Sequence, residues 1–260
     1  MTRILIYSHD TFGLGNIRRM VRIAEELVAR HGNASVLLVT GSPMLHAFRL
    51  PPRIDYVKLP CLARDTDGAY GVKHLDMAFD DAVRMRASLT LSAASDFSPD
   101  IVLVDKKPLG VAGELAPTLE LFSRRATPPA IHLLLRDILD TPRATRAIWE
   151  AQGYHAAIAR FYDSVIVVGD RTIFDMAHAY GFPPSTTNKL CYAGYLDRAP
   201  RDHAPCSSET TATIPRVLVH AGGGEDGAFL IDATLDALRM AGPQRGGLSA
   251  GRSKIVGRPL

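Results

Sequence analysis

Residues 4–19 read ILIYSHDTFGLGNIRR, and this stretch decides the fold. Its first four residues are apolar and predict a buried strand, which polar residues end at Ser8. Gly13 and Gly15 then precede a helix predicted over about 15–30, whose apolar positions recur at three- and four-residue spacing. Strand, glycine-containing turn and helix in this order are typical of the first unit of a parallel α/β sheet.

The same pattern continues along the chain. Short runs rich in Val, Ile and Leu predict further strands, and periodic segments between them predict helices; residues 61–72 are predicted to be a polar loop. Near-continuous apolar strands separated by helices indicate a parallel sheet covered on both faces. With the right-handed crossover rule, they predict the α/β class and a doubly wound, Rossmann-like fold. The predicted strands are 36–39, 54–57, 101–104, 130–135, 165–168 and 190–193, and the predicted helices are 75–94, 110–125 and 142–160.

The composition changes after Gly194, which predicts a domain boundary. We expect a first domain over 1–195 and a proline-containing linker over 196–215. The start of a second Rossmann-like domain follows at 216–241, with a strand at 217–220 and a helix at about 228–239. One such unit cannot bury its own apolar faces, so the second domain is predicted to be incomplete. Residues 242–260 are rich in glycine and basic residues, and predict a disordered tail or one foreign to the fold.

The bulk composition excludes several classes. A net charge of +3 over 260 residues is too weakly basic to indicate nucleic acid, although it is compatible with an anionic small substrate. Three scattered cysteines without a CxxC pair indicate neither a zinc ribbon nor a disulfide framework. No signal peptide and no membrane-spanning run is recognised, so a cytoplasmic location is expected.

The turn after the first predicted strand is the first candidate ligand site. Glycines there would let a ligand approach backbone N–H groups at a helix start. Arg18 occupies the place of the third glycine of a dinucleotide fingerprint, and Thr40-Gly41 ends the second strand where an acidic residue is expected; both departures argue against NAD. The alternative is a tight turn without a ligand. His9 is a candidate base, with Asp10 as its partner, or else a structural residue.

Arg18, Arg19 and Arg22 lie in the first turns of the predicted helix. Cations there oppose the helix dipole at a cost of roughly 0.3–1 kcal/mol each, which a bound phosphate or carboxylate would reverse. The alternative is a solvated helix face on which Arg22 pairs with Glu26 four residues later.

Two further segments are candidates. Asp105, Lys106 and Lys107 directly follow a strand, and Gly110 opens the next predicted helix; this is typical of a cleft wall, unless Asp105 only caps the strand and the lysines face water. The second segment, 222–227, reads GGGEDG between a strand and a helix. Its free N–H groups could hold a diphosphate, or Asp226 could be a plain N-cap.

These three segments together resemble a bacterial group of predicted GT-B glycosyltransferases. That group is distantly related to the N-acetylglucosaminyltransferase that completes the lipid-linked peptidoglycan precursor, and the resemblance covers roughly residues 1–240. It implies two Rossmann-like domains across a cleft, the first for the acceptor and the second for a nucleotide-diphosphate sugar. It also implies transfer without a metal or other cofactor, because backbone N–H groups and a helix dipole would stabilise the leaving diphosphate.

On this resemblance the site residues fall into three sets. Relatives often have His where this chain has Asn16, so the base falls to His9 or Asp10. The family's donor domain also continues well beyond residue 240, and weak or no turnover is predicted for this chain. The acceptor side comprises Gly13, Gly15, Asn16, Arg18, Arg19, Asp105 and Lys106, and the donor-phosphate side comprises Gly222, Gly223, Gly224, Asp226 and Gly227.

The leading functional prediction is therefore transfer of a hexose or N-acetylhexosamine from a nucleotide-diphosphate sugar to an unknown hydroxyl acceptor. The prediction includes peripheral contact with a membrane and excludes nucleic acid as a partner. The alternative is a non-catalytic nucleotide- or anion-binding α/β module. A nicotinamide or flavin enzyme is disfavoured by Arg18 and Thr40.

Overall fold

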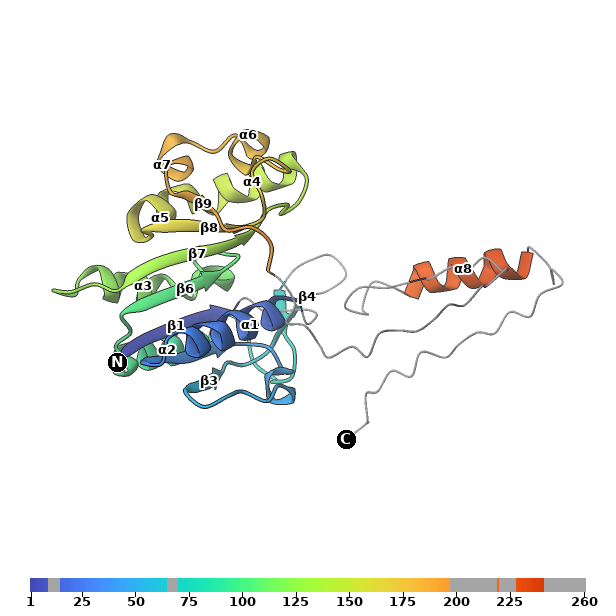
Figure 1. Ribbon diagram of the computed structural model, residues 1–260. Coiled ribbons are helices and arrows are strands. Elements are labelled where there is room, and N and C mark those ends of the chain that lie inside the picture. The colour runs from blue at the N-terminus through green and yellow to red at the C-terminus, as the bar shows by residue number, and fades with distance from the viewer. Residues whose placement is uncertain (9–14, 65–69, 197–218, 220–227, 241–260) are drawn as a thin grey trace. The chain divides into compact units, whose positions relative to one another are not determined.

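The structure is a computed structural model, and it describes residues 1–8, 15–64, 70–196, 219 and 228–240 (Figure 1). The chain divides into two compact units, Met1–Ala199 and Pro200–Leu260. In the second unit the structure describes Val219 and one helix, α8 (Ala228–Met240). The first unit carries the sheet.

Seven parallel strands form that sheet in the order β3-β2-β1-β6-β7-β8-β9 (Figure 1). The chain winds from β1 outward to β3, returns to the middle at β6, and then winds outward in the other direction to β9. This topology confirms the predicted doubly wound, Rossmann-like α/β fold. The strands are β1 (Thr2–Ser8), β2 (Ala34–Thr40), β3 (Ile54–Lys58), β6 (Ile101–Asp105), β7 (Ala130–Arg136), β8 (Ser164–Val168) and β9 (Leu190–Tyr192).

Helices fill most connections between the strands. The longest crosses from β3 back to β6, as the reversal of strand order requires. The helices are α1 (Gly15–Arg30), α2 (Phe79–Phe97), α3 (Ala116–Ser123), α4 (Pro142–Ala151), α5 (Tyr154–Phe161), α6 (Met176–Tyr180) and α7 (Pro184–Thr187), with short 3-10 turns η1 (Leu45–Ala47) and η2 (Val111–Gly113). Within the part of the chain that the structure describes, no helix is long and apolar enough to cross a membrane.

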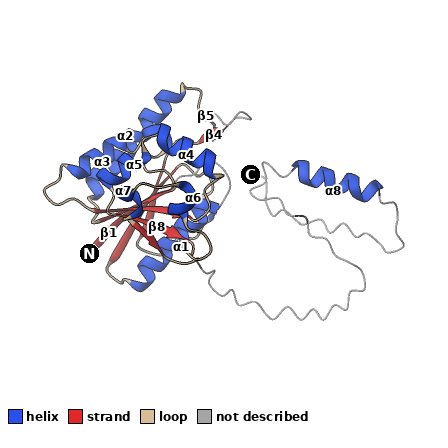
Figure 2. Cartoon of the chain, turned by 90° about the horizontal axis from the view of Figure 1, so that it is seen from above, coloured by secondary structure: helices blue, strands red, loops and turns tan. Residues whose placement is uncertain are grey.

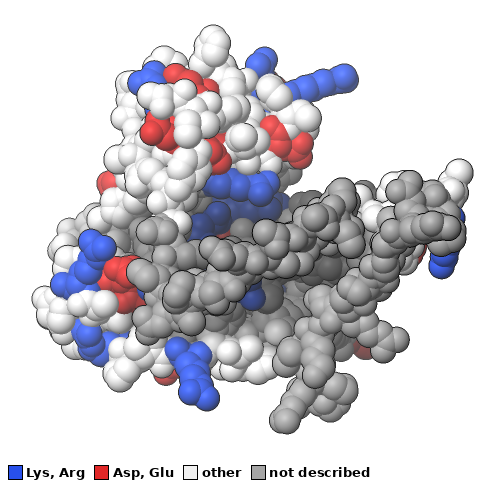
Figure 3. Space-filling view, turned by 45° about the vertical axis from the view of Figure 1, so that its right-hand side comes forward, with Lys and Arg blue, Asp and Glu red and all other residues white. Residues whose placement is uncertain are grey.

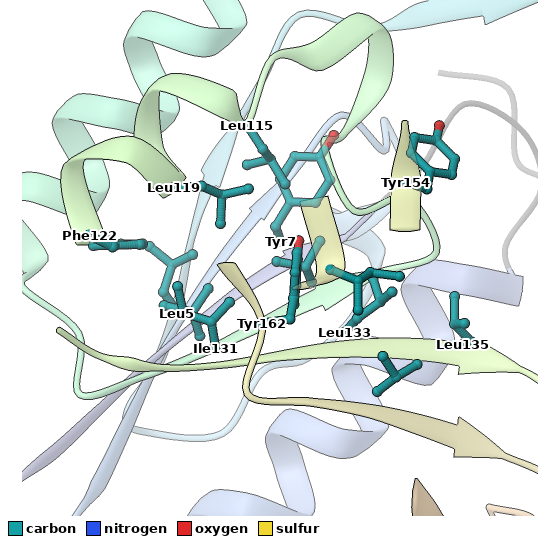
Figure 4. Close-up of a cluster of buried hydrophobic side chains, with 14 of the residues drawn as sticks. Leu5, Tyr7, Leu115, Leu119, Phe122, Ile131, Leu133, Leu135, Tyr154 and Tyr162 are labelled. Atoms are coloured by element: carbon teal, nitrogen blue, oxygen red, sulfur yellow. The ribbon is translucent and has the colours of Figure 1, made fainter. Parts of the chain in front are cut away.

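The central strands bury apolar side chains on both faces, which explains their near-continuous apolar sequences. On β1, Leu5 and Tyr7 belong to one core cluster, together with residues of α3 and α5. Ile4 and Ile6 belong to a second cluster, with residues of α1. Figure 2 shows helices on both sides of the strands, and Figure 4 shows part of the first cluster around Tyr7. The sheet is therefore the middle of three layers.

A basic residue just before β3 binds the carboxyl end of α1. Arg53 lies just before β3 and donates to the carbonyl oxygens of Val28 at 2.5 Å and Gly32 at 2.6 Å. It also donates to those of His31 and Ala34. The last carbonyls of a helix have no partner within the helix, so this guanidinium acts as a cap.

Four sequence predictions need correction. The loop predicted at 61–72 contains a short antiparallel ribbon, β4 (Leu62–Arg64) and β5 (Tyr70–Val72). The helix predicted at 75–94 runs instead from Phe79, just before Asp80 and Asp81 in its first turn, to Phe97. The helix predicted at 110–125 is divided into η2 and α3. The one predicted at 142–160 breaks at Gly153, whose φ is 61°.

Candidate functional site at the carboxyl ends of the central strands

The strand order reverses between β1 and β6, and this point defines the candidate site. The two strands are neighbours, but the chain leaves them in opposite directions along the sheet. In open α/β sheets ligands bind in the crevice outside the carboxyl ends of the strands at such a point. Ser8 ends β1 and Asp105 ends β6, and both are buried.

An ion pair joins the first turns of α1 to the end of β6. The Arg19 guanidinium donates to Asp105, whose side chain has 0% exposure, while the Arg19 side chain is 16% exposed. Arg19 also donates to the Asn16 side-chain oxygen at 3.4 Å. Three of the predicted acceptor-side residues therefore lie together, although they come from segments 86 residues apart in the chain.

The other two arginines of α1 behave differently. Arg22 pairs with Glu26 at 2.6 Å and with Glu25 at 3.6 Å, so the predicted solvated-face alternative is confirmed for Arg22. Arg18 is exposed, and no described residue forms an ion pair with it. Only Arg19 of the three is directed to the strand end.

The turn after β6 has an unusual backbone. Lys106 has φ of 68°, a left-handed conformation that is uncommon for residues other than glycine, and its N–H donates to the Leu134 carbonyl at 2.9 Å. The Lys107 ammonium donates to the Tyr70 hydroxyl at 3.0 Å, which brings the β4–β5 ribbon to this turn. The alternative in which Asp105 only caps the strand and both lysines face water is therefore wrong.

Lys106 is half-buried, and burial is the main cause that lowers its pKa. The charges of Arg136 and Lys107 act in the same direction, while Tyr70 and Asp105 oppose them. The ammonium is thus held partly out of water beside other cations.

A buried polar cluster of Tyr7, Arg86 and Glu114 lies next to the turn after β6. Arg86 of α2 donates to Glu114 through Nε at 2.5 Å and Nη2 at 2.7 Å, and through Nη1 to the Pro60 carbonyl at 2.6 Å. The Tyr7 hydroxyl of β1 also donates to Glu114. Arg86, Glu114 and Tyr7 are each at most 1% exposed, so the cluster ties β1, α2 and the segment after β6 together in the interior.

Gly110 is the position where the turn meets this cluster. Its φ is 72° and its ψ is −162°, a combination that is essentially restricted to glycine. A Cβ atom there would lie 3.0 Å from the Tyr7 hydroxyl and from side-chain carbons of Glu114 and Leu115. The turn can therefore adopt this path only with glycine at this position.

Sequence reasoning missed this cluster. Arg86 lies inside a predicted helix and Glu114 lies 28 residues later, and nothing in their spacing indicates a pair. A charged residue on the buried face of a helix is the one sign of a buried ion pair that a sequence can offer. Such a residue does not indicate which other residue is its partner.

Most of the remaining predicted site residues lie outside the described part of the chain. Gly15 is the first residue of α1. The candidate bases His9 and Asp10, together with Gly13, lie outside the described residues, as do all the donor-phosphate candidates: Gly222, Gly223, Gly224, Asp226 and Gly227. The predicted strand 217–220 also lies outside them except for Val219, which belongs to no helix or strand.

The fold and this edge define the class: a Rossmann-like α/β domain with its candidate ligand site at the β1–β6 reversal. No known family model matches the chain, and no curated protein matches its sequence. Among solved structures it is similar to a UGT transferase from Siraitia grosvenorii in complex with UDP, with 9% identity over 75% of this chain and 50% of that chain and a TM-score of 0.45.

Two other solved structures are also similar. The calicheamicin glycosyltransferase CalG4 has 15% identity over 78% of this chain and 57% of its own, with a TM-score of 0.42. The glycotransferase of kitacinnamycin has 14% identity over 78% of this chain and 53% of its own, with a TM-score of 0.47. The chain spans about half the length of these structures.

Proposed function

We propose that this chain carries the acceptor-side domain and a first donor-side segment of a glycosyltransferase of the GT-B type, which as a whole protein acts on a nucleotide-diphosphate sugar and a hydroxyl acceptor. The observation that supports the proposal best is the joining of Asn16, Arg19 and Asp105 at the β1–β6 reversal. These residues belong to the two N-terminal segments that carry the resemblance to predicted GT-B glycosyltransferases. The part-buried ion pair between Arg19 and Asp105 joins these segments at the edge where ligands of such folds bind.

In the proposed site the Arg19–Asp105 pair has a positioning role. Both charges are largely neutralised by each other, and the pair holds the start of α1 against the end of β6. The amide of Asn16 can donate to and accept from an acceptor hydroxyl, but it cannot take a proton from it. The base therefore remains assigned to His9 or Asp10, in the segment that links β1 to α1.

The end of β2 supports this proposal over a nicotinamide enzyme. Dinucleotide-binding domains hold the ribose with an acidic residue near that strand end. Here Thr40 is buried there, and its hydroxyl accepts from the Ser42 N–H at 3.0 Å. Gly41 lies between them, so the segment offers no carboxylate for a ribose.

The donor half of the proposal depends on segment 222–227. Its consecutive glycines precede α8, and free N–H groups before a helix are a common binding site for a diphosphate. Asp226 would then lie at the start of that helix. The nucleotide, the sugar and the acceptor belong to the whole protein and are proposals for this chain.

Calorimetric titration of the full chain with UDP, GDP and NADH, each under the same conditions, tests the proposed class. We expect heat of binding from UDP or GDP and none from NADH. Binding of NADH without binding of UDP or GDP would contradict the proposal and favour a nicotinamide enzyme.

A second candidate is a non-catalytic anion-binding module. The half-buried Lys106, near Arg136 and Lys107, favours it because a group of cations attracts small anions without selecting a nucleotide. This candidate predicts heat from inorganic phosphate but none from either nucleotide. It also predicts that even a full-length relative consumes no donor sugar when incubated with nucleotide sugars.

A further inference from the structure

Three cations gather at the carboxyl ends of β6 and β7; we call Lys106, Lys107 and Arg136 the cationic cluster. The two strands are parallel neighbours with Asp105 opposite Leu134, so the segment starting at Lys106 runs beside the end of β7 at Arg136. The 2.9 Å hydrogen bond from the Lys106 N–H to the Leu134 carbonyl fixes this placement. Figure 3 shows Lys and Arg side chains gathered in the middle of one face.

The carboxylates near the cationic cluster have other partners. Asp105 pairs with Arg19. Asp137, the residue after β7, accepts from the Tyr195 hydroxyl at 2.7 Å and from the Ile138 N–H at 2.8 Å. Within the described ranges, no carboxylate lies within 4.0 Å of a cation of the cluster.

The neutral partners of the cluster leave donors available. Lys107 donates to the Tyr70 hydroxyl, and Arg136 donates from one nitrogen to the Leu139 carbonyl at 2.9 Å. Among the described residues no other group accepts a hydrogen bond from Arg136. A guanidinium has five N–H donors in a planar fork, so most of its capacity to bind a phosphate or carboxylate remains.

Of the cationic cluster, Lys106 is the residue whose position in the fold is energetically unfavourable. It is half-buried and its backbone is left-handed at φ 68°. The like charges of Arg136 and Lys107 act on its ammonium, with Tyr70 and Asp105 opposing them. A partly desolvated cation without a carboxylate partner is unfavourable, and a bound anion would offset that cost. Backbone strain of this kind persists where the surrounding structure holds it in place.

We propose that the cationic cluster binds an anionic group of the acceptor, a phosphate or a carboxylate, and so selects charged acceptors over neutral ones. The assignment of this anion to an acceptor rests on the proposed function. The cluster lies beside the β1–β6 reversal, so an anion bound there would hold one end of the acceptor while its hydroxyl reaches Asn16 at the start of α1. This deepens the proposed function by naming the chemical class of the acceptor.

The test is calorimetric titration of the full chain with inorganic phosphate, inorganic pyrophosphate and malonate. We expect at least one of these anions to bind, and to bind more weakly as ionic strength rises. Binding of the phosphates alone, weakened in the Lys106 and Arg136 variants described next, indicates a phosphorylated acceptor rather than binding at segment 222–227. Binding of malonate alone, weakened in the same variants, indicates a carboxylate. Heat from none of the three would overturn the proposal.

Substitutions in the cationic cluster test whether the anion binds there. Lys106→Met and Arg136→Gln should each weaken anion binding by roughly tenfold, because each removes one charge-assisted contact. Lys106→Arg should retain most of the affinity. The control is Arg124→Gln, which removes one positive charge from an exposed side chain at the end of α3. Equal weakening by the control and by Lys106→Met, with both variants folded by thermal unfolding, would also overturn the proposal.

The two proposals fail in different ways. If an anion binds through Lys106 but neither UDP nor GDP binds, the anion site stands and the glycosyltransferase proposal falls. If UDP or GDP binds but no anion binds, the sugar-transfer proposal stands and the charged-acceptor inference falls.

Discussion

Single residues decide the geometry of the candidate site, and the buried pair of Arg86 with Glu114 is the clearest case. Taking two charges out of water is unfavourable, and their mutual contacts offset that cost only while both are present. Here each carboxylate oxygen of Glu114 accepts from the guanidinium, and the Tyr7 hydroxyl adds a third donor. Loss of either charge would leave the other buried without its partner.

Arg86→Ala should therefore lower the free energy of unfolding by roughly 3–5 kcal/mol, measured by urea denaturation. Arg84→Ala, two residues earlier on the same helix, is the matched control, because Arg84 pairs with Asp81 in an exposed position and should matter little. Similar losses from the two variants would contradict the assigned role of the buried pair.

Gly110 offers a second test at the same scale. Gly110→Ala should destabilise the fold by roughly 3 kcal/mol or more, since it combines a strained backbone with contacts that leave no room for a Cβ. Gly153→Ala is the control: Gly153 also has positive φ, at 61°, but nothing lies within 4 Å of a Cβ there. Gly153→Ala should lower the free energy of unfolding by only about 1–2 kcal/mol. If thermal melts show equal shifts for both variants, close packing at Gly110 is not important.

At the scale of elements, polar side chains fix where helices end and how they meet the strands. Arg53 caps α1, and Lys189 acts in the same way on α5, donating to the carbonyls of Ile158, Ala159 and Tyr162 at 2.6–3.0 Å. Both residues stand just before a strand, β3 and β9. Each cap therefore links the end of one helix to the start of a strand.

Arg53→Gln should shorten α1 at its last turn and lower the free energy of unfolding by roughly 1 kcal/mol, because several helix-end carbonyls lose a charged donor. Amide hydrogen exchange should show the loss locally, as faster exchange in residues 27–31. Arg49→Gln changes an exposed arginine in the same connection and should leave this exchange as it is. Unchanged exchange in Arg53→Gln would contradict the capping role.

Elements also show what the sequence could and could not predict. The central strands of the main sheet were predictable because each contains an apolar run. Helix α1 was predicted over the residues it occupies because its apolar spacing is regular. The β4–β5 ribbon was missed because its short strands, LAR and YGV, are interrupted by an arginine or a glycine and contain no apolar run. The break at Gly153 was missed because one glycine in a periodic segment predicts a break only weakly.

The candidate site was partly predictable for the same physical reason. Ligands bind at the carboxyl ends of parallel strands, and this rule was enough to select Asn16, Arg19, Asp105 and Lys106 as candidates. The pairing of Arg19 with Asp105, the support from Arg86 and Glu114, and the position of Arg136 depend on which strands are neighbours and which side chains meet. That information resides in tertiary packing and not in local spacing.

For the molecule as a whole, two buried tyrosines predict how stability depends on pH. Burial, followed by the charge of Glu114, raises the pKa of Tyr7 well above its ordinary value, and burial raises the pKa of Tyr162 in the same way. A raised pKa in the folded state means that the stability contribution is fully present below about pH 10, where the unfolded tyrosine titrates. It is lost as the pH rises from there towards the folded pKa.

Tyr7→Phe should therefore reduce the alkaline loss of stability above pH 10 by about 1.4 kcal/mol per pH unit, the slope that one proton contributes. Tyr162→Phe should do the same, and the double variant should show twice the reduction. The measurement is urea denaturation at several pH values between neutral and strongly alkaline. A slope in Tyr7→Phe equal to that of the wild type would show that the buried hydroxyl does not resist ionisation.

The central claim is that the carboxyl edge around β1 and β6 is the ligand site of this fold. Amide NMR spectra of the isotope-labelled full chain, titrated with inorganic pyrophosphate, test it most directly, because pyrophosphate carries the charge shared by nucleoside diphosphates and phosphorylated acceptors. We predict the largest shift changes among the described residues at Ser8, Lys106 and Lys107. Arg3 and Ala130, at the opposite edge of the sheet, should show none. Largest changes at that opposite edge, or no changes anywhere, would contradict the account.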